Sequence, residues 1–326
     1  SKDFAAGVIC NAGTLGILIP PSIVMVVYAA ATDVSVGRMF LAGVIPGLLA
    51  GTMLMVTIYF YARYKGMPKG EWAGWTEVFS AARAASWGLF LVVIILGGIY
   101  GGYFTPTEAA AVASVYAFLV SMFIYRDMGP LKTVDGQTPL TLRANPRALF
   151  TAWFHPDTRQ TLYDAGRLSI TLLFIIANAL ILKHVLTDEQ IPQTIATAML
   201  AAGLGPIMFL VMVNLILLIG GQFMEPSGLI VVVAPLVFPI AIELGIDPIH
   251  LGIIMVVNME IGMITPPVGL NLFVTSGVAG MSVMRVVKAA TPWLGILFVF
   301  LIMVTYIPAL STFLPNYFMG PELIIR

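Results

Sequence analysis

The sequence predicts an all-α polytopic membrane protein, built from inverted repeats with a re-entrant hairpin and broken transmembrane helices. The composition is 59% hydrophobic and 10% charged, with a mean hydropathy of +0.98, as integral membrane proteins have. Several apolar runs are long enough to cross a bilayer as helices, and none shows the alternation of a membrane β-barrel. Two of these runs are interrupted by the same Pro-Pro motif.

The repeated motif is Gly16-Ile-Leu-Ile-Pro-Pro-Ser22 near one end of the chain and Gly262-Met-Ile-Thr-Pro-Pro-Val268 near the other, 246 positions along. Each Pro removes an amide donor and clashes with the preceding turn, so neither run can be one continuous helix. Unpaired backbone at membrane depth is tolerated only where protein or a water-filled cavity covers it. Paired interruptions of this kind are the best sequence indication of a transporter's midplane binding site.

Apolar runs and charged loops predict how the chain crosses the membrane. The loops at 63–83 and 126–167 are rich in Arg and Lys, and two spans separate them. They must therefore share a side, which the positive-inside rule makes the cytoplasm. The individual spans are predicted at 39–62, 87–102, 107–125 and 168–186. The whole chain divides into a first broken helix at 1–38, scaffold spans at 39–125, a long cytoplasmic loop at 126–167, a scaffold span with an acidic outer linker at 168–205, a hairpin with the second broken helix at 206–288, and a final span at 289–326.

Residues 206–244 are predicted to form a re-entrant hairpin with its polar tip at Gly220–Gly228, because each arm is short for a full span. Two ordinary spans instead would place Arg285 and Lys288 outside. With the hairpin, the second broken helix enters from the outside and the first runs the other way, which is inverted-repeat topology. By the same symmetry we expect a matching hairpin before Ser1, so that this chain lacks an N-terminal portion carrying half of the site.

Four motifs, which follow one another along essentially the whole chain in the family's order, resemble those of a known family. It is the large, DctM-like membrane subunit of TRAP transporters (tripartite ATP-independent periplasmic transporters). The loop at 126–167 is longer than expected for the common form. The motifs are Gly13-Thr-Leu-Gly-Ile-Leu-Ile-Pro-Pro-Ser22, Phe104-Thr-Pro-Thr-Glu-Ala-Ala110, Gly245-Ile-Asp-Pro-Ile-His250 and Gly262-Met-Ile-Thr-Pro-Pro-Val-Gly269.

This resemblance implies a multi-pass protein of the bacterial inner membrane that imports an organic anion with Na+ as coupling ion. C4-dicarboxylates, sialic acids and other sugar or keto acids are all open as substrates. The implied partners are a periplasmic substrate-binding protein and a small four-helix membrane subunit, separate or fused. It also implies an ion-transporter-like fold that moves as an elevator, with no cofactor. The number of sodium ions and the oligomeric state stay open.

Candidate site residues gather at the two breaks and at the hairpin tip. Sodium needs oxygen ligands, which unwound backbone and neighbouring hydroxyl or amide groups supply, while half-helix N-termini favour an anionic substrate group. Sodium is the only metal ion expected. The sodium candidates are Asn11, Thr14, Gly16, Glu225, Ser227, Gly262, Thr265, Gly269 and Asn271. The substrate candidates are Pro20, Pro21, Ser22, Asn258, Glu260, Pro266 and Pro267.

Three of these residues have alternative roles that the sequence leaves open. Thr265 could be only the N-cap of a half-helix that starts at Pro266. Glu225 could ligate sodium, carry a proton, or cap the helix after Pro226. Glu260 could face a cytoplasmic crevice or a structural partner.

Two other kinds of protein remain as alternatives to this transporter. One is a binding-protein-independent divalent-anion/sodium symporter with the same inverted hairpins, and the other is a non-transporting scaffold of a membrane complex. An enzyme is not expected, because the three His residues are far apart in sequence and no nucleophile, metal or nucleotide motif is recognisable. Sixteen basic residues balance sixteen acidic ones, which gives no indication of nucleic-acid binding.

Overall fold

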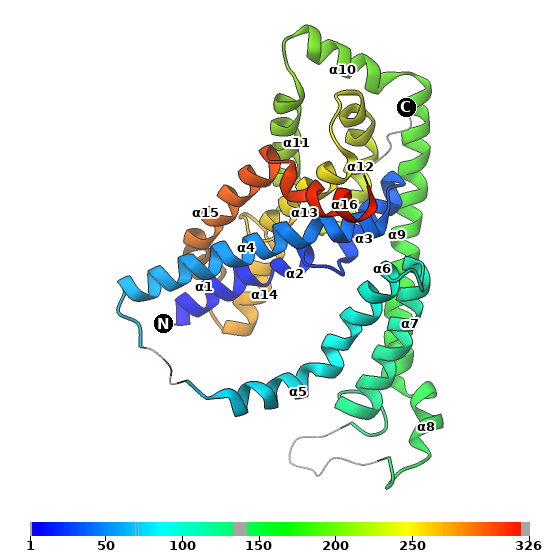
Figure 1. Ribbon diagram of the computed structural model, residues 1–326, viewed down its shortest axis with the longest axis vertical. Coiled ribbons are helices and arrows are strands. Elements are labelled where there is room, and N and C mark those ends of the chain that lie inside the picture. Colours follow the sequence, from blue (N-terminus) through cyan, green and yellow to red (C-terminus); the bar gives the residue numbers. More distant parts are fainter. Residues whose placement is uncertain (1, 69, 71, 133–141, 321–326) are drawn as a thin grey trace. The chain divides into compact units, whose positions relative to one another are not determined.

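A computed structural model describes residues 2–68, 70, 72–132 and 142–320, and these form helices and connecting turns (Figure 1). Six helices in the described residues are long and apolar enough to cross a membrane, and up to eight if each bent pair counts as one span. The all-α polytopic class is therefore confirmed. The chain divides into two compact units, with residues 1–68 and 174–326 in unit 1 and residues 69–173 in unit 2.

Unit 1 contains both broken helices. The first comprises α1 (Lys2–Ala12), the single turn α2 (Leu15–Leu18) and α3 (Ile23–Thr32), and it bends by 42° at the break. The second comprises α13 (Pro248–Gly262) and α14 (Leu270–Ala279). The interruptions fall at the two Pro-Pro motifs, as the sequence predicts.

The packing within unit 1 shows that the two broken helices run in opposite directions. Helix α1 packs against α14, and α13 packs against α3. The following helices, α4 (Val36–Tyr64) and α15 (Val283–Tyr306), also pack across the repeats, because α1 packs mainly on α15, and α13 packs on α4 as well as on α15. Figure 1 shows α1 leading towards α3 while α13 leads back towards α14. The inverted-repeat prediction is confirmed.

Aromatic packing fixes α1 to the long helices of both repeats. Phe4 of α1 stacks on Tyr61 of α4, with ring centroids 5.6 Å apart, and meets the edge of Trp293 of α15 at 5.5 Å. Tyr61 and Trp293 also meet edge to face at 5.3 Å. Such pairs contribute about 0.5–1.5 kcal/mol each beyond the area that they bury, so this cluster holds the first half-helix in place.

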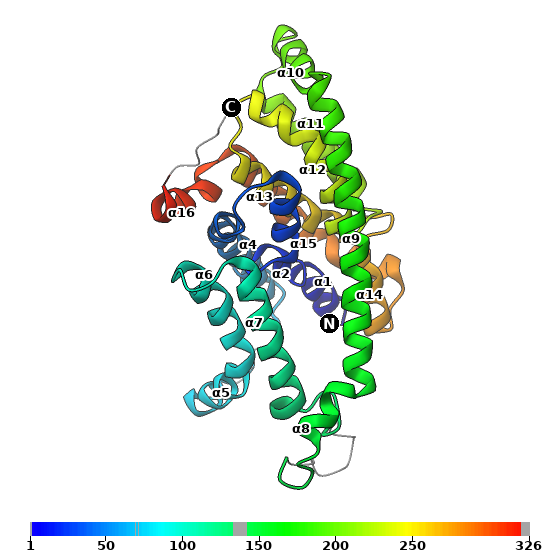
Figure 2. The same ribbon diagram turned by 90° about the vertical axis from the view of Figure 1, so that its right-hand side faces the viewer.

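The hairpin predicted for 206–244 is a helix–turn–helix unit of α11 (Pro206–Gly221) and α12 (Pro226–Glu243). Helix α11 packs against α13 and α12 against α3, so the hairpin contacts both repeats (Figure 2). Its re-entrance into the membrane stays a prediction. Before it, the predicted linker contains a further helix, α10 (Ile191–Ala201), which is bent by 118° from α11.

Two predicted spans begin too late, and the structure corrects them. The span predicted at 87–102 begins with α5 (Trp75–Val92) and continues through η1 (Val93–Gly97) and α6 (Gly98–Tyr100), so that Arg83 lies on a helix and not in a loop. The span predicted at 168–186 is part of α9 (Pro156–Asp188). Hydropathy marks only the apolar part of a helix, whereas the Ala-rich stretch before Trp87 has neither Gly nor Pro to prevent helix formation.

The remaining span boundaries agree more closely with the prediction. The span predicted at 107–125 is α7 (Pro106–Leu119) continued by η2 (Val120–Tyr125), and Thr105 with Glu108 forms a capping box at its start. The final segment holds α16 (Ala309–Met319) in addition to α15. Residues 133–141 of the long loop lie outside the described part of the chain. The functional division into scaffold and transport segments stays a prediction.

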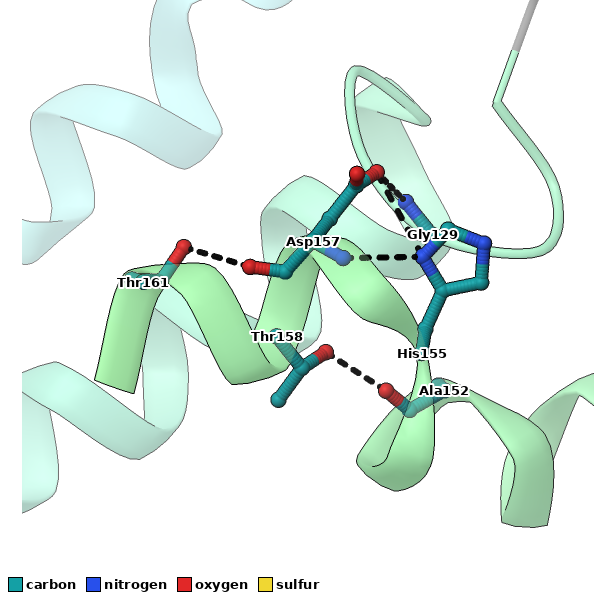
Figure 3. Close-up of polar contacts among 6 residues, drawn as sticks. All are labelled: Gly129, Ala152, His155, Asp157, Thr158 and Thr161. Atoms are coloured by element: carbon teal, nitrogen blue, oxygen red, sulfur yellow. Dashed lines mark hydrogen bonds and ion pairs between the residues drawn. The ribbon is translucent and has the colours of Figure 1, made fainter. Parts of the chain in front are cut away.

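In unit 2, a polar cluster fixes the start of α9 to the turn that follows η2 (Figure 3). Asp157 Oδ2 accepts a hydrogen bond from the N–H of Gly129 at 2.9 Å and lies 3.5 Å from Nδ1 of His155. Just before His155, after α8 (Ala148–Thr151), Trp153 in η3 (Ala152–Phe154) stacks on Phe118 of α7 with ring centroids 4.4 Å apart. These contacts join the two ends of the long predicted loop.

Candidate functional site

The hairpin turn touches the second break directly. The N–H of Gly269 donates to the carbonyl oxygen of Gln222 at 3.0 Å. A Cβ added at Gly262 would lie 2.8 Å from backbone atoms of Gly221, which is closer than real Cβ contacts. Glycine at Gly262 therefore allows the end of α13 to approach the hairpin backbone. The structure thus brings together the predicted break and the predicted hairpin tip.

Backbone carbonyls gather around Gly269 within the break. Its φ of +57° lies in the left-handed region that favours glycine. A Cβ there would lie 2.9 Å from the oxygen of Thr265 and 3.1 Å from that of Met263. The Met263 oxygen also accepts from the N–H of Asn271 at 3.0 Å. This unwound stretch has the oxygen-rich backbone that sodium sites in broken helices use.

Thr265 does not cap the helix that follows it. Its hydroxyl donates to the carbonyl oxygen of Ile261 at 2.7 Å, at the C-terminal end of α13. Helix α14 begins only at Leu270, and its N-cap is Gly269. The hypothesis of an N-cap before Pro266 is therefore wrong, because the chain stays unwound through both prolines. The Thr265 hydroxyl oxygen keeps lone pairs that an ion could use.

Glu225 at the hairpin tip is the N-cap of α12. Its two carboxylate oxygens accept from the N–H groups of Ser227 and Gly228, both at 3.0 Å. The capping role considered for Glu225 is therefore confirmed, and the side chain remains exposed. Ser227 is buried in the first turn of α12, at 5% exposure.

At the first break, the polar side chains face the protein interior. Asn11 and Thr14 are fully buried, and the amide of Asn11 donates to the oxygens of Gly7 and Ala290 at 2.9 and 3.2 Å. Gly16 is exposed, and a Cβ there would meet nothing within 4 Å. Of these three candidates, Gly16 is thus the one whose backbone is open to an ion or a substrate.

The two Pro-Pro motifs differ in how far they are exposed, and Ser22 after the first of them is buried. Pro20 is buried and Pro21 is half-buried, whereas Pro266 and Pro267 are exposed. Ser22 is buried and caps α3 by accepting from the N–H of Met25 at 3.4 Å. The prolines of the second break are therefore more exposed than those of the first.

Two predicted substrate residues lie inside unit 1 in this conformation. Asn258 is fully buried and donates to Oδ1 of Asn214 at 2.6 Å. Glu260 is 1% exposed, and its Oε1 lies 2.8 Å from Oγ1 of Thr14. Neither side chain reaches the surface of the breaks. Thr14 is a structural partner of Glu260, as one of the alternatives for Glu260 in the sequence analysis expected.

Sequence reasoning missed Asn214 and Gln222. The amide of Asn214 also donates to the hydroxyl of Thr305 at 3.1 Å, and the carbonyl oxygen of Thr305 lies 3.3 Å from Nε2 of His250. The chain of contacts ends at Ser311, whose hydroxyl lies 2.7 Å from Nδ1 of His250. The sequence could have indicated Asn214, because it is the one polar side chain in the otherwise apolar α11, and polar side chains often form hydrogen bonds between membrane helices.

The donor set at the second break fits sodium. Its ligands would be backbone carbonyls with hydroxyl and amide oxygens, which suit hard cations, whereas soft or borderline metals favour thiolate and imidazole. No group of three or more His, Cys, Asp or Glu that could hold a metal ion occurs within the described ranges.

Comparison with known proteins decides the family. Residues 1–310 match the family model described as the tripartite ATP-independent periplasmic transporter, DctM component. The chain belongs to this family. The resemblance and the transporter class are confirmed, and the family is one of transport components, not of enzymes.

Among its curated relatives are three proteins named C4-dicarboxylate TRAP transporter large permease protein DctM. The one from Vibrio cholerae serotype O1 is 71% identical over 326 residues, covering 100% of this chain and 71% of the relative. The one from Pseudomonas aeruginosa is 60% identical over 316 residues, covering 97% and 68%. The one from Rhodobacter capsulatus is 46% identical over 329 residues, covering 97% and 69%.

Proposed function

We propose that this TRAP permease chain moves C4-dicarboxylates inward through the bacterial inner membrane, driven by sodium. The observation that carries the proposal is the contact between the hairpin turn and the second break, at Gln222–Gly269 and Gly221–Gly262. In this contact the unwound backbone of the break lies against the hairpin turn, and broken-helix transporters build ion sites at unwound segments of this kind. The substrate class is supported by the names of the three relatives described above.

In this proposal, sodium binds the carbonyl-rich stretch between Gly262 and Gly269, close to the C-terminal end of α13. A helix C-terminus carries partial negative charge and favours the cation. The Thr265 hydroxyl and the Asn271 amide are close enough in sequence to complete the ligand shell. The N-terminus of α14 has no side-chain cap, so its positive end is available to a substrate carboxylate.

The first break holds a second sodium site in the same proposal. Inverted symmetry makes Gly16 the counterpart of Gly262. Since Asn11 and Thr14 are buried in this conformation, the backbone oxygens around Gly16 would bind the ion first. Asn11 and Thr14 would position the end of α1 beside it.

The partners follow from the family. A periplasmic binding protein delivers the substrate, and a small membrane subunit braces the permease while the broken helices and the hairpin move as an elevator. The family's tripartite name and the description of a large permease support both partners.

Reconstitution tests the proposal. The complete permease, with its small subunit, is placed in proteoliposomes and supplied with its binding protein and radiolabelled succinate. Uptake is expected only with an inward sodium gradient, and it should stop when potassium replaces sodium. Equal uptake without a sodium gradient contradicts sodium coupling. Equal uptake without the binding protein supports the binding-protein-independent symporter instead.

A further inference from the structure

A pocket lies where the start of α1, the end of α4 and the start of α15 meet, away from both breaks. Figure 1 shows the start of α1 beside the end of α4. The pocket has a volume of about 370 Å³, which is within the size range of small-ligand sites. Segments of both repeats line it, and the lining includes Asp3, Phe4, Tyr61, Lys65, Lys288 and Trp293. A group bound here would contact the two repeats together.

One wall of this pocket is aromatic. Phe4, Tyr61 and Trp293 contact one another with ring centroids 5.3 to 5.6 Å apart. Trp293 is buried, whereas Phe4 and Tyr61 are half-buried. Tyr and Trp are enriched at the depth where a membrane protein meets the lipid headgroups, because one end of each ring is apolar and the other is polar. The wall therefore suits a ligand that combines a polar group with an apolar part.

The charge of the pocket is positive. Lys65 and Lys288 line it, and neither of them forms an ion pair with a carboxylate of the described residues. The lining also contains the carboxylate of Asp3, but Oδ1 of this group lies 2.8 Å from Nε of Arg285. Since Arg285 balances Asp3, two ammonium groups remain for an anion.

The predicted topology places both lysines on the cytoplasmic side of the membrane. Lys65 follows α4 and Lys288 lies in the first turns of α15, so they come from different repeats. Their presence in one pocket agrees with the prediction that they share a side. The cytoplasmic leaflet contains anionic lipids, and basic pockets between membrane helices on this side bind their headgroups.

The face of α15 that carries Lys288 continues as an apolar stripe. Pro292, Ile296 and Val299 follow Lys288 on successive turns of the helix, at the spacing that puts residues on one face. Pro292 and Val299 are exposed, and Ile296 is half-buried. An acyl chain can lie along this stripe while its headgroup occupies the pocket.

We propose that this pocket binds the phosphodiester headgroup of an anionic phospholipid from the cytoplasmic leaflet. The ammonium groups of Lys65 and Lys288 pair with the phosphate, the aromatic wall packs against the glycerol, and an acyl chain follows the stripe on α15. Inorganic phosphate has the same charged group but nothing to place on the aromatic wall or the stripe, so the lipid fits better. The bound lipid holds the start of α15 to the end of α4.

Native mass spectrometry of the complete permease, titrated with phosphatidylglycerol in detergent, tests the proposal. The double variant Lys65→Gln/Lys288→Gln should bind the lipid roughly 25-fold more weakly, because each lysine near an anionic headgroup contributes about fivefold. Lys65→Arg/Lys288→Arg keeps both charges and should retain most of the affinity. The matched control is Lys132→Gln/Arg147→Gln, which removes two exposed cations of the long loop and should bind as wild type does. Wild-type affinity in the first variant, or an equal loss in the control, overturns the proposal.

A comparison of ligands on the wild-type permease needs no variant, so it stays usable if the lysine variant does not fold. Phosphatidylglycerol should raise the melting temperature, whereas phosphatidylcholine and inorganic phosphate at matched ionic strength should not. Equal stabilisation by phosphatidylcholine shows that the headgroup charge is not recognised, and equal stabilisation by inorganic phosphate shows a site for the free anion. Either result overturns the proposal. Neither measurement depends on sodium or substrate, so failure here leaves sodium-driven uptake untouched.

Discussion

The two breaks share one sequence pattern but differ in what covers them. At the second break, a Cβ on Gly262 would meet the hairpin backbone, and the N–H of Gly269 is bound to Gln222. At the first break, a Cβ on the equivalent Gly16 would meet nothing within 4 Å. The Pro-Pro motif therefore interrupts the helix in both repeats, but a covered site needs a hairpin against the break.

The largest expected effect comes from filling the contact between Gly262 and the hairpin. Gly262→Ala should lower the free energy of unfolding by about 1–3 kcal/mol, because the Cβ forces two backbones apart, and should abolish most uptake. Gly16→Ala should leave the melting temperature at or slightly above that of wild type. Thermal unfolding in detergent measures both variants. Equal destabilisation of the two would remove the distinction between the breaks.

The next effect concerns the ion site itself. Thr265→Ala and Glu225→Gln should each raise the sodium concentration for half-maximal uptake roughly three- to tenfold, which corresponds to the loss of one hydrogen bond or ligand. Membrane abundance should not change. Sodium titration of uptake in proteoliposomes measures the shift. If both variants keep the wild-type sodium dependence, these residues are not part of the site.

A smaller effect is expected from the amide pair behind the second break. Asn214→Leu removes the side-chain acceptor of Asn258, which keeps only the Asn214 carbonyl oxygen at 3.2 Å, and should cost about 1 kcal/mol, as hydrogen bonds between membrane helices typically do. Asn178→Leu, on an exposed face of α9, is the control and should cost nothing measurable. Denaturant titration in detergent compares them. An unchanged Asn214→Leu protein would show that this network does not stabilise α13.

The smallest difference concerns two arginines, Arg38 near the start of α4 and Arg285 near the start of α15. Arg38 donates to the carbonyl oxygens of Gly320 and Met319 at the C-terminal end of α16, at 2.7 and 2.9 Å, whereas Arg285 forms an exposed ion pair with Asp3 at 2.8 Å. Arg38→Ala should cost about 1 kcal/mol, because a cation at a helix C-terminus is favourable. Arg285→Ala should cost about half of that or less. Melting temperatures measured at low and high salt compare the two variants. A larger loss of stability for Arg285→Ala than for Arg38→Ala would contradict this ranking.

Local sequence rules predicted the features that depend on local chemistry. Two double prolines stop a helix wherever they occur, so the breaks and the opposed repeats could be predicted from the chain alone. The starts of α5 and α9 could not, because helices extend beyond the apolar part that hydropathy detects. The burial of Asn258 and Glu260 could not be predicted from the sequence either, because their partners Asn214 and Thr14 come from distant segments of the chain.

A cryo-EM map of the complete transporter in sodium and succinate is the most direct test of the central claim. The account predicts ion density among the backbone oxygens between Gly262 and Gly269, against the hairpin turn at Gln222, with the substrate carboxylate at the N-terminus of α14. A map that shows α13 and α14 as one continuous helix, or sodium bound away from both breaks, would contradict it.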